Sequence, residues 1–219
     1  MASVNSGGVE IVYDVMNAGG SGAPVFFLAG LNGMRQACMK QAIPFSKERP
    51  VVVHDQRGTG ASGKKLGVYS VHNMAKDVIA IMDHEGIAKA HMVGTSTGGA
   101  IAQVLCIDHR DRVASAAVCC SWMKCDHYFR RQFEMRKRIL LTMGTETLML
   151  QTSTTLNDPK WFTEHYEELL DREKGLLERA GPPEVDAERI DAIMAFDESA
   201  RLGRIETPVT VIGSKNDAV

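Results

Sequence analysis

Ser96 stands between two glycines in the stretch VGTSTGGA (93–100), where an apolar run gives way to a helix-like run. The spacing Gly94-x-Ser96-x-Gly98 is typical of a sharp strand-to-helix turn that presents a nucleophilic hydroxyl above a sheet. The next residue, Thr97, would begin the helix, so its unpaired N–H group could receive a developing oxyanion. The alternative is a glycine-rich turn that binds phosphate, but neither common phosphate-binding spacing surrounds Ser96.

Alternating strands and helices must position this serine. Continuous apolar runs are typical of strands that are covered on both faces, and they occur here at 24–29, 50–54, 90–93 and 113–119. Residues 71–85 and 97–108 have helical spacing of apolar residues. This alternation predicts an α/β fold in which a mostly parallel sheet is wrapped by helices.

The strand pattern stops between residues 121 and 198 and returns at 208–213. The intervening segment has a basic helix over 130–138, an acidic helix over 161–180 and a further helical stretch over 185–196. We therefore predict a core (1–120), a helical cap insertion (121–198) and the resumed core (199–219). Candidates to line a substrate pocket beneath the cap, or else to pack the cap on the core, are Trp122, Met123, Phe129, Phe133 and Trp161.

The composition is ordinary for a soluble globular protein. The chain has 219 residues, 44% of them hydrophobic, and a net charge of −2, which gives no reason to expect binding to nucleic acid or to an anionic membrane. The N-terminus lacks the pattern of a signal peptide, and the five cysteines favour reduced thiols and a cytoplasmic location. Cys119 and Cys120 are adjacent and would point to opposite faces of a strand, so we expect no metal site.

Four segments give the chain a resemblance to the α/β-hydrolase fold family, and the likeness covers nearly the whole sequence. They are FFLAGLNG (26–33), VVVHDQRGTGAS (51–62), HMVGTSTGGAIAQ (91–103) and IETPVTVIGSKND (205–217). Within this family the chain is most similar to the branch of 3-oxoadipate enol-lactonases and aminoacrylate hydrolases, because the start of its cap, Ser121-Trp122-Met123 followed by FRRQFEMRKRIL, resembles theirs.

The resemblance implies a role for each residue of the site. Ser96 would be the nucleophile, the backbone amides of Leu31 and Thr97 would form the oxyanion hole, and Asp217 would be the catalytic acid. Leu31 follows Ala29-Gly30 where the family usually has His-Gly, a departure that leaves the backbone donor intact. For Asp217 the alternative is an ordinary turn aspartate, since Asn-Asp is common in turns.

The catalytic histidine of this family follows the acid in the chain. None of the seven histidines lies after Asp217, so we expect the chain to lack its last strand, its last helix and its catalytic base. Such a chain would be poorly active and, with an exposed sheet edge, prone to form a homodimer. If the short chain were active, His127 or His165 in the cap would become the candidate base.

The resemblance implies a serine hydrolase of small carboxylic esters, lactones or related acyl compounds that needs no cofactor. Two alternatives stay open. One is a hydrolase of carbon–carbon bonds or carbamates with the same triad, and the other is a non-catalytic binding protein built on the same fold.

Overall fold

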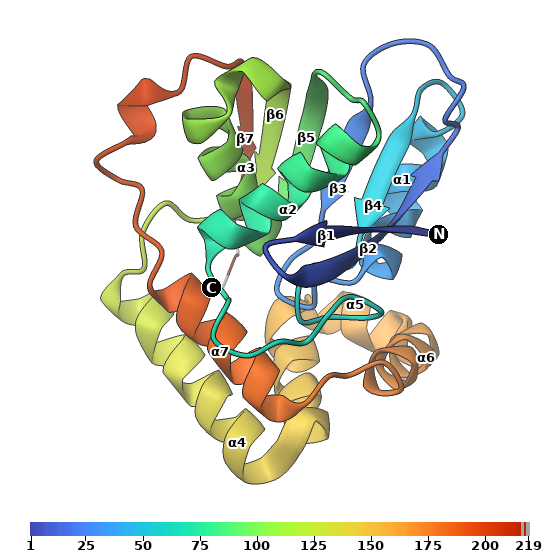
Figure 1. Ribbon diagram of the computed structural model, residues 1–219. Helices are drawn as coiled ribbons and strands as arrows, with labels where there is room; N and C mark the ends of the chain where they lie inside the picture. Colours follow the sequence, from blue (N-terminus) through green and yellow to red (C-terminus); the bar gives the residue numbers. More distant parts are fainter. Residues whose placement is uncertain (216, 218–219) are drawn as a thin grey trace.

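The computed structural model describes residues 1–215 and 217, and these residues contain a seven-stranded sheet with the order β1-β2-β4-β3-β5-β6-β7 (Figure 1). Only the pairs β1–β2 and β2–β4 are antiparallel and the other four pairs are parallel, so the prediction of a mostly parallel sheet is confirmed. The strands are β1 (Ala2–Ser6), β2 (Val9–Met16), β3 (Val25–Leu28), β4 (Val51–His54), β5 (Ala90–Thr95), β6 (Val113–Cys119) and β7 (Val209–Ile212).

Helices cover the two faces of this sheet through alternate residues of its strands. On β3, Phe26 and Leu28 belong to the larger core, which includes residues of α2 (Val71–His84) and α3 (Thr97–Asp108). Val25 and Phe27 point to the opposite face, where a smaller cluster includes Ala42 of α1 (Met39–Phe45). Burial on both faces explains why the central strands are continuous apolar runs.

Helices α4 to α7 gather at the carboxyl ends of the parallel strands, at the bottom of Figure 1. The predicted acidic helix is divided at His165, whose backbone leaves helical geometry, and the basic helix continues beyond its predicted end to a non-helical residue, Gly144. Between 121 and 198, the described residues form no strand apart from an isolated bridge that joins Lys124 to Asp197. The helices are α4 (His127–Leu156), α5 (Pro159–Glu164), α6 (Tyr166–Leu177) and α7 (Pro183–Met194).

One part of the sheet is open on the α1 side. A groove of about 520 Å³ follows β5, β6 and β7 there, and its lining includes Phe45, His91, Ala117 and Val209. Val211 of β7 is 77% exposed. Among the described residues, no helix has both the length and the apolar character needed to cross a bilayer.

Candidate active site

Ser96 occupies a strained turn between β5 and α3. Its φ of 53° and ψ of −118° lie in a region that residues with a β-carbon rarely adopt. The backbone holds this conformation from β6: the Ser96 amide donates to the Cys119 carbonyl at 2.9 Å, and Ser121 Oγ donates to the Ser96 carbonyl at 2.8 Å. Within the part of the chain that the structure describes, Ser96 Oγ has no hydrogen-bond partner. The fold thus holds Ser96 in a strained backbone conformation in which its hydroxyl forms no hydrogen bond with the described residues.

The glycines around Ser96 allow three segments to approach one another. A β-carbon on Gly94 would overlap the Gly98 carbonyl, and one on Gly98 would overlap the Leu28 carbonyl. A β-carbon on Gly30 would lie 3.4 Å from Ser96 Cβ and 3.8 Å from Ser96 Oγ. The turn after β3 therefore lies directly against the serine side chain.

This packing brings the two predicted oxyanion donors to the serine from two segments. Thr97 is the first residue of α3, is fully buried, and has an N–H group that lacks an acceptor one turn back in its helix. The second predicted donor, the Leu31 N–H group, belongs to the peptide that follows Gly30, which lies beside Ser96. The arrangement suits a carbonyl carbon at Ser96 Oγ whose oxygen would sit between two backbone donors.

None of the seven histidines forms a hydrogen bond with Ser96 within the described residues. His54 is buried in β4, and burial lowers its pKa. His127 is exposed at the start of α4, and the ring of His165 stacks on Trp161 with centroids 4.6 Å apart. Neither alternative base is thus in contact with the serine hydroxyl.

Asp217 follows β7, whose end lies at the same edge of the sheet as Ser96 because β5, β6 and β7 are parallel. Its side chain is exposed, and its amide donates to the Ser214 carbonyl at 3.3 Å. This position agrees with both the catalytic and the turn interpretation of the residue.

Three of the five predicted pocket residues form an aromatic row above this edge of the sheet. The ring centroids of Trp122 and Phe129 are 4.6 Å apart, and those of Phe129 and Phe133 are 4.4 Å apart. Leu31 packs against the same cluster. Met123 is 48% exposed, and Trp161 lies on α5, where it contacts His165 instead of the row.

A small cavity of about 70 Å³ adjoins Leu31. Its lining combines the turn after β3 with the turn after β4 and with cap residues, among them Thr59, Met149 and Arg179. The cavity therefore lies between core and cap, next to a predicted oxyanion donor.

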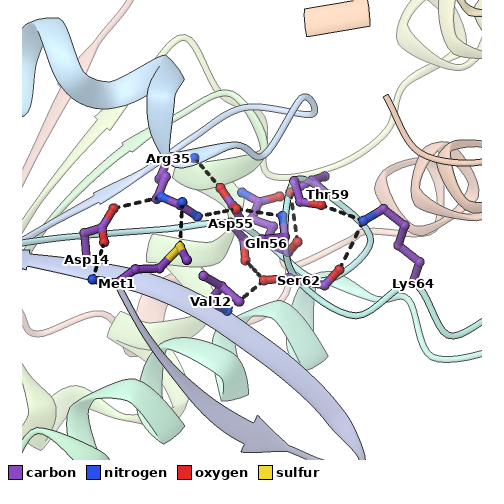
Figure 2. A network of polar contacts seen from close by, with 11 residues as sticks. Met1, Val12, Asp14, Arg35, Asp55, Gln56, Thr59, Ser62 and Lys64 are labelled. Atoms are coloured by element: carbon purple, nitrogen blue, oxygen red, sulfur yellow. Dashed lines mark hydrogen bonds and ion pairs between the residues drawn. The ribbon is translucent and has the colours of Figure 1, made fainter. Parts of the chain in front are cut away.

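The turn 55–62 after β4 is held by a network of polar contacts (Figure 2). Asp55 accepts from the backbone amides of Arg35 and Ala61, both at 2.9 Å, and pairs with the Arg35 guanidinium at 2.5 Å. Ser62 Oγ donates to the Asp55 carbonyl at 2.6 Å, and a β-carbon on Gly60 would overlap the Asp55 carboxylate. The motif D-x-R-G-x-G-x-S thus encodes a rigid turn that ties the segment after β3 to the sheet. Sequence reasoning did not single out the partners of this turn, which are Arg35, Asp77 and Arg189.

Comparisons with known proteins agree with this geometry. The family model of the α/β hydrolase fold matches residues 23–219. A protein of Azorhizobium caulinodans named as carbamate hydrolase RutD is 30% identical over 219 residues, which are 100% of this chain and 82% of the relative. The enol-lactonase of Burkholderia xenovorans LB400 superposes with a TM-score of 0.89 at 22% identity, over 98% of this chain and 81% of that one. A thermophilic esterase of Thermogutta terrifontis superposes with a TM-score of 0.85 at 24% identity, over 100% and 81%. The chain belongs to the α/β-hydrolase fold family.

Proposed function

We propose that the protein is a serine hydrolase that cleaves small carboxylic esters, lactones or related acyl compounds. The observation that carries this proposal is Ser96, which combines a strained φ of 53° with a hydroxyl that is unpartnered among the described residues. A fold that needed only a turn at this place would have no reason to hold a serine in this conformation.

The proposed chemistry follows the arrangement of backbone donors. Ser96 Oγ attacks the substrate carbonyl carbon while its proton passes to a base, and the carbonyl oxygen becomes an oxyanion held by the amides of Thr97 and Leu31. One such donor is typically worth about 3 kcal/mol in the transition state. The leaving group departs with a proton, and water then hydrolyses the acyl-serine. In this fold the base is a histidine oriented by an acid, and Asp217 is the acid that we propose.

Carbamate cleavage is the second candidate, and the relative named as carbamate hydrolase favours it. Attack on a carbamate carbonyl can break its C–O or its C–N bond, and C–N cleavage depends more strongly on proton return, because an amine leaves less readily than an alcohol. Small esters and lactones place a weaker demand on that step. Rates on a methyl ester, a small lactone and a methyl carbamate of matched size would therefore rank the three substrate classes.

A fluorophosphonate probe tests the proposal. We expect the probe to label the full-length protein at Ser96, identified by mass spectrometry of the peptide that carries it, and to abolish hydrolysis of p-nitrophenyl acetate. Absence of labelling in a protein that still unfolds cooperatively on heating, and is therefore folded, would contradict catalysis and favour a binding protein built on this fold.

A further inference from the structure

Arg189 joins the cap to the turn that carries one proposed oxyanion donor. It lies on α7, its side chain is fully buried, and its guanidinium donates to three oxygens of the core. These are the Leu31 carbonyl at 2.6 Å, Gln56 Oε1 at 2.9 Å and the Arg57 carbonyl at 3.0 Å. A cation on the cap therefore contacts the segment 29–31 directly and through Gln56.

Every carbonyl of that segment is held by a hydrogen bond. Gln56 Nε2 donates to the Ala29 carbonyl at 2.8 Å, and the Gly33 amide donates to the Gly30 carbonyl at 2.9 Å. Arg189 donates to the third carbonyl, that of Leu31, and it also holds the Gln56 side chain by a hydrogen bond to Oε1. Gln56 and Arg189 thus restrain two of the three carbonyls of the segment.

Holding these carbonyls fixes the direction of the Leu31 N–H group. The Gly30–Leu31 peptide is trans, like every described peptide, so its N–H points opposite to the Gly30 carbonyl. The Gly33 amide, which donates to the Gly30 carbonyl, holds this peptide directly, and Gln56 and Arg189 hold the carbonyls of the two adjoining peptides. Because Gly30 lies against Ser96, the direction of this N–H decides whether it meets an oxyanion there.

The surroundings are shaped to admit the guanidinium. A β-carbon on Gly33 would lie 2.8 Å from Arg189 Nη2, and one on Gly58 would lie 3.0 Å from Arg189 Cδ. Burial lowers the pKa of Arg189 to about 10, which still leaves it charged at neutral pH, and Asp186 opposes this shift. A cation that is buried at such cost, in a space kept by two glycines, needs more explanation than the attachment of a helix, which apolar residues would achieve.

We infer that Arg189 is a positioning residue for catalysis, which holds the segment 29–31 in place from the cap, so that the oxyanion hole is complete only when the cap is docked. Gln56 is its partner on the core side. This inference rests on the proposed acyl hydrolysis at Ser96. It adds that the cap contributes to the rate of the chemical step as well as to the shape of the pocket.

Two substitutions remove the clamp from opposite sides. Arg189→Met keeps a flexible side chain of similar length but loses the donors, and Gln56→Leu removes the core partner without altering any cap residue. Each should lower kcat with p-nitrophenyl acetate by about tenfold to a hundredfold, below the 10²–10³-fold loss typical of deleting an oxyanion donor, while KM changes less than threefold. Arg189→Lys should fall in between, because one ammonium group cannot reach all three oxygens.

The matched control is Lys137→Met, which removes a cation that joins two cap helices, α4 and α7, instead of joining the cap to the core. Lys137 Nζ pairs with Asp191 at 2.7 Å, and both side chains are partly exposed. Lys137→Met should leave both kcat and KM within twofold of the parent protein.

Affinity for a tetrahedral inhibitor separates positioning from a merely structural role. A trifluoromethyl ketone forms an adduct whose oxyanion would lie between the Thr97 and Leu31 amides, so Arg189→Met and Gln56→Leu should weaken it about as much as they lower kcat. A merely structural role would instead reduce the fraction of sites that a fluorophosphonate titrates and leave the affinity of the remaining sites unchanged. That result, or an unchanged kcat in Gln56→Leu, would overturn the inference. Labelling at a residue other than Ser96 would overturn the proposed function instead.

Discussion

The turn 55–62 of the core and helix α4 of the cap bury arginines in opposite ways. In the core, Arg57 donates to both carboxylate oxygens of Asp77, at 2.8 and 2.6 Å, and also to the Val68 carbonyl at 2.9 Å. In the cap, Arg136 is only 5% exposed, yet its Nε and Nη2 have no acceptor among the described residues. Its guanidinium lies 4.8 Å from the ring centre of Phe133, and burial lowers its pKa.

The difference shows which of the two regions satisfies the hydrogen-bonding groups of its buried arginine. Buried polar groups are almost always paired, and an unpaired one marks a functional or strained place. The turn 55–62 meets this rule, as expected for a scaffold that must hold Ser96 and Leu31 still. The inner face of α4 does not meet it, although Phe133 and Phe129 of that face belong to the aromatic row that packs with Leu31.

The largest effect should come from the serine that the core holds. Ser96→Ala should lower kcat/KM for p-nitrophenyl acetate by at least about 10³-fold, because members of a catalytic triad act as a unit. The thermal midpoint should stay close to that of the parent protein, since alanine fits wherever serine does. Retention of substantial hydrolysis by the purified variant would exclude Ser96 as the nucleophile.

The next effect concerns the stability of the core. Asp77→Ala leaves the Arg57 guanidinium buried without its counter-charge, which should lower the free energy of unfolding by about 3–5 kcal/mol in urea titrations. Asp83→Ala is the control on the same helix, because Asp83 is 62% exposed in its pair with Arg112 and should cost less than about 1 kcal/mol. Equal losses in the two variants would mean that the buried pair is no more important than a surface pair.

Much of the fold is predictable from the sequence because burial on two faces leaves a clear pattern. The strands around Phe26, Val52 and Met92 are continuous apolar runs, and Ser96 follows the last of them. β1 was not predicted, because it is an edge strand whose residues alternate between exposed and half-buried and include polar Ser3 and Asn5. Its position depends on pairing with β2, which local sequence does not encode.

The site is predictable only where one short segment carries it. The turn around Ser96 is local, so the spacing of its glycines reveals it. Arg189 is 132 residues away from Arg57 in sequence, and only the folded cap brings them together. One signal existed: Arg189 is four residues from both Val185 and Ile193, so it lies on the buried face of α7, where a cation is unexpected.

Replacement of the unpaired cap arginine should have a smaller effect on stability, and of the opposite sign to that of Asp77→Ala. Arg136→Met removes a buried charge without orphaning a partner, so the free energy of unfolding should be unchanged or higher by about 1 kcal/mol. Arg138→Met, at an exposed position of the same helix, is the control. A loss above about 2 kcal/mol would show that Arg136 is paired in solution and would remove the contrast between the two regions. A larger loss of kcat/KM for a carboxylate-bearing ester than for a neutral ester would assign the guanidinium to substrate binding.

His54 should have an effect only in acid, and it sharpens the comparison because it is a core residue with unpaired polar atoms. It is 2% exposed, and neither ring nitrogen has a partner among the described residues. Unlike an arginine, a histidine can be buried as a neutral group. Burial lowers its pKa despite the opposing influence of Asp77 and Asp55.

A histidine whose pKa is lower in the folded than in the unfolded state makes the protein less stable as the pH decreases. Below the unfolded pKa of about 6.5, the unfolded chain binds a proton that the folded protein refuses. This residue should therefore contribute a loss of up to about 1.4 kcal/mol per pH unit as the pH falls below that value, and no change above about pH 7.5. His54→Leu should remove this contribution, whereas His127→Gln, at an exposed position, should keep it. Urea titrations of the three proteins at pH 7.5 and 5.5 measure the difference. The same pH dependence in His54→Leu as in the parent would mean that His54 is solvated or paired in solution. His54 would then be no exception to the pairing of buried polar groups seen in the turn 55–62.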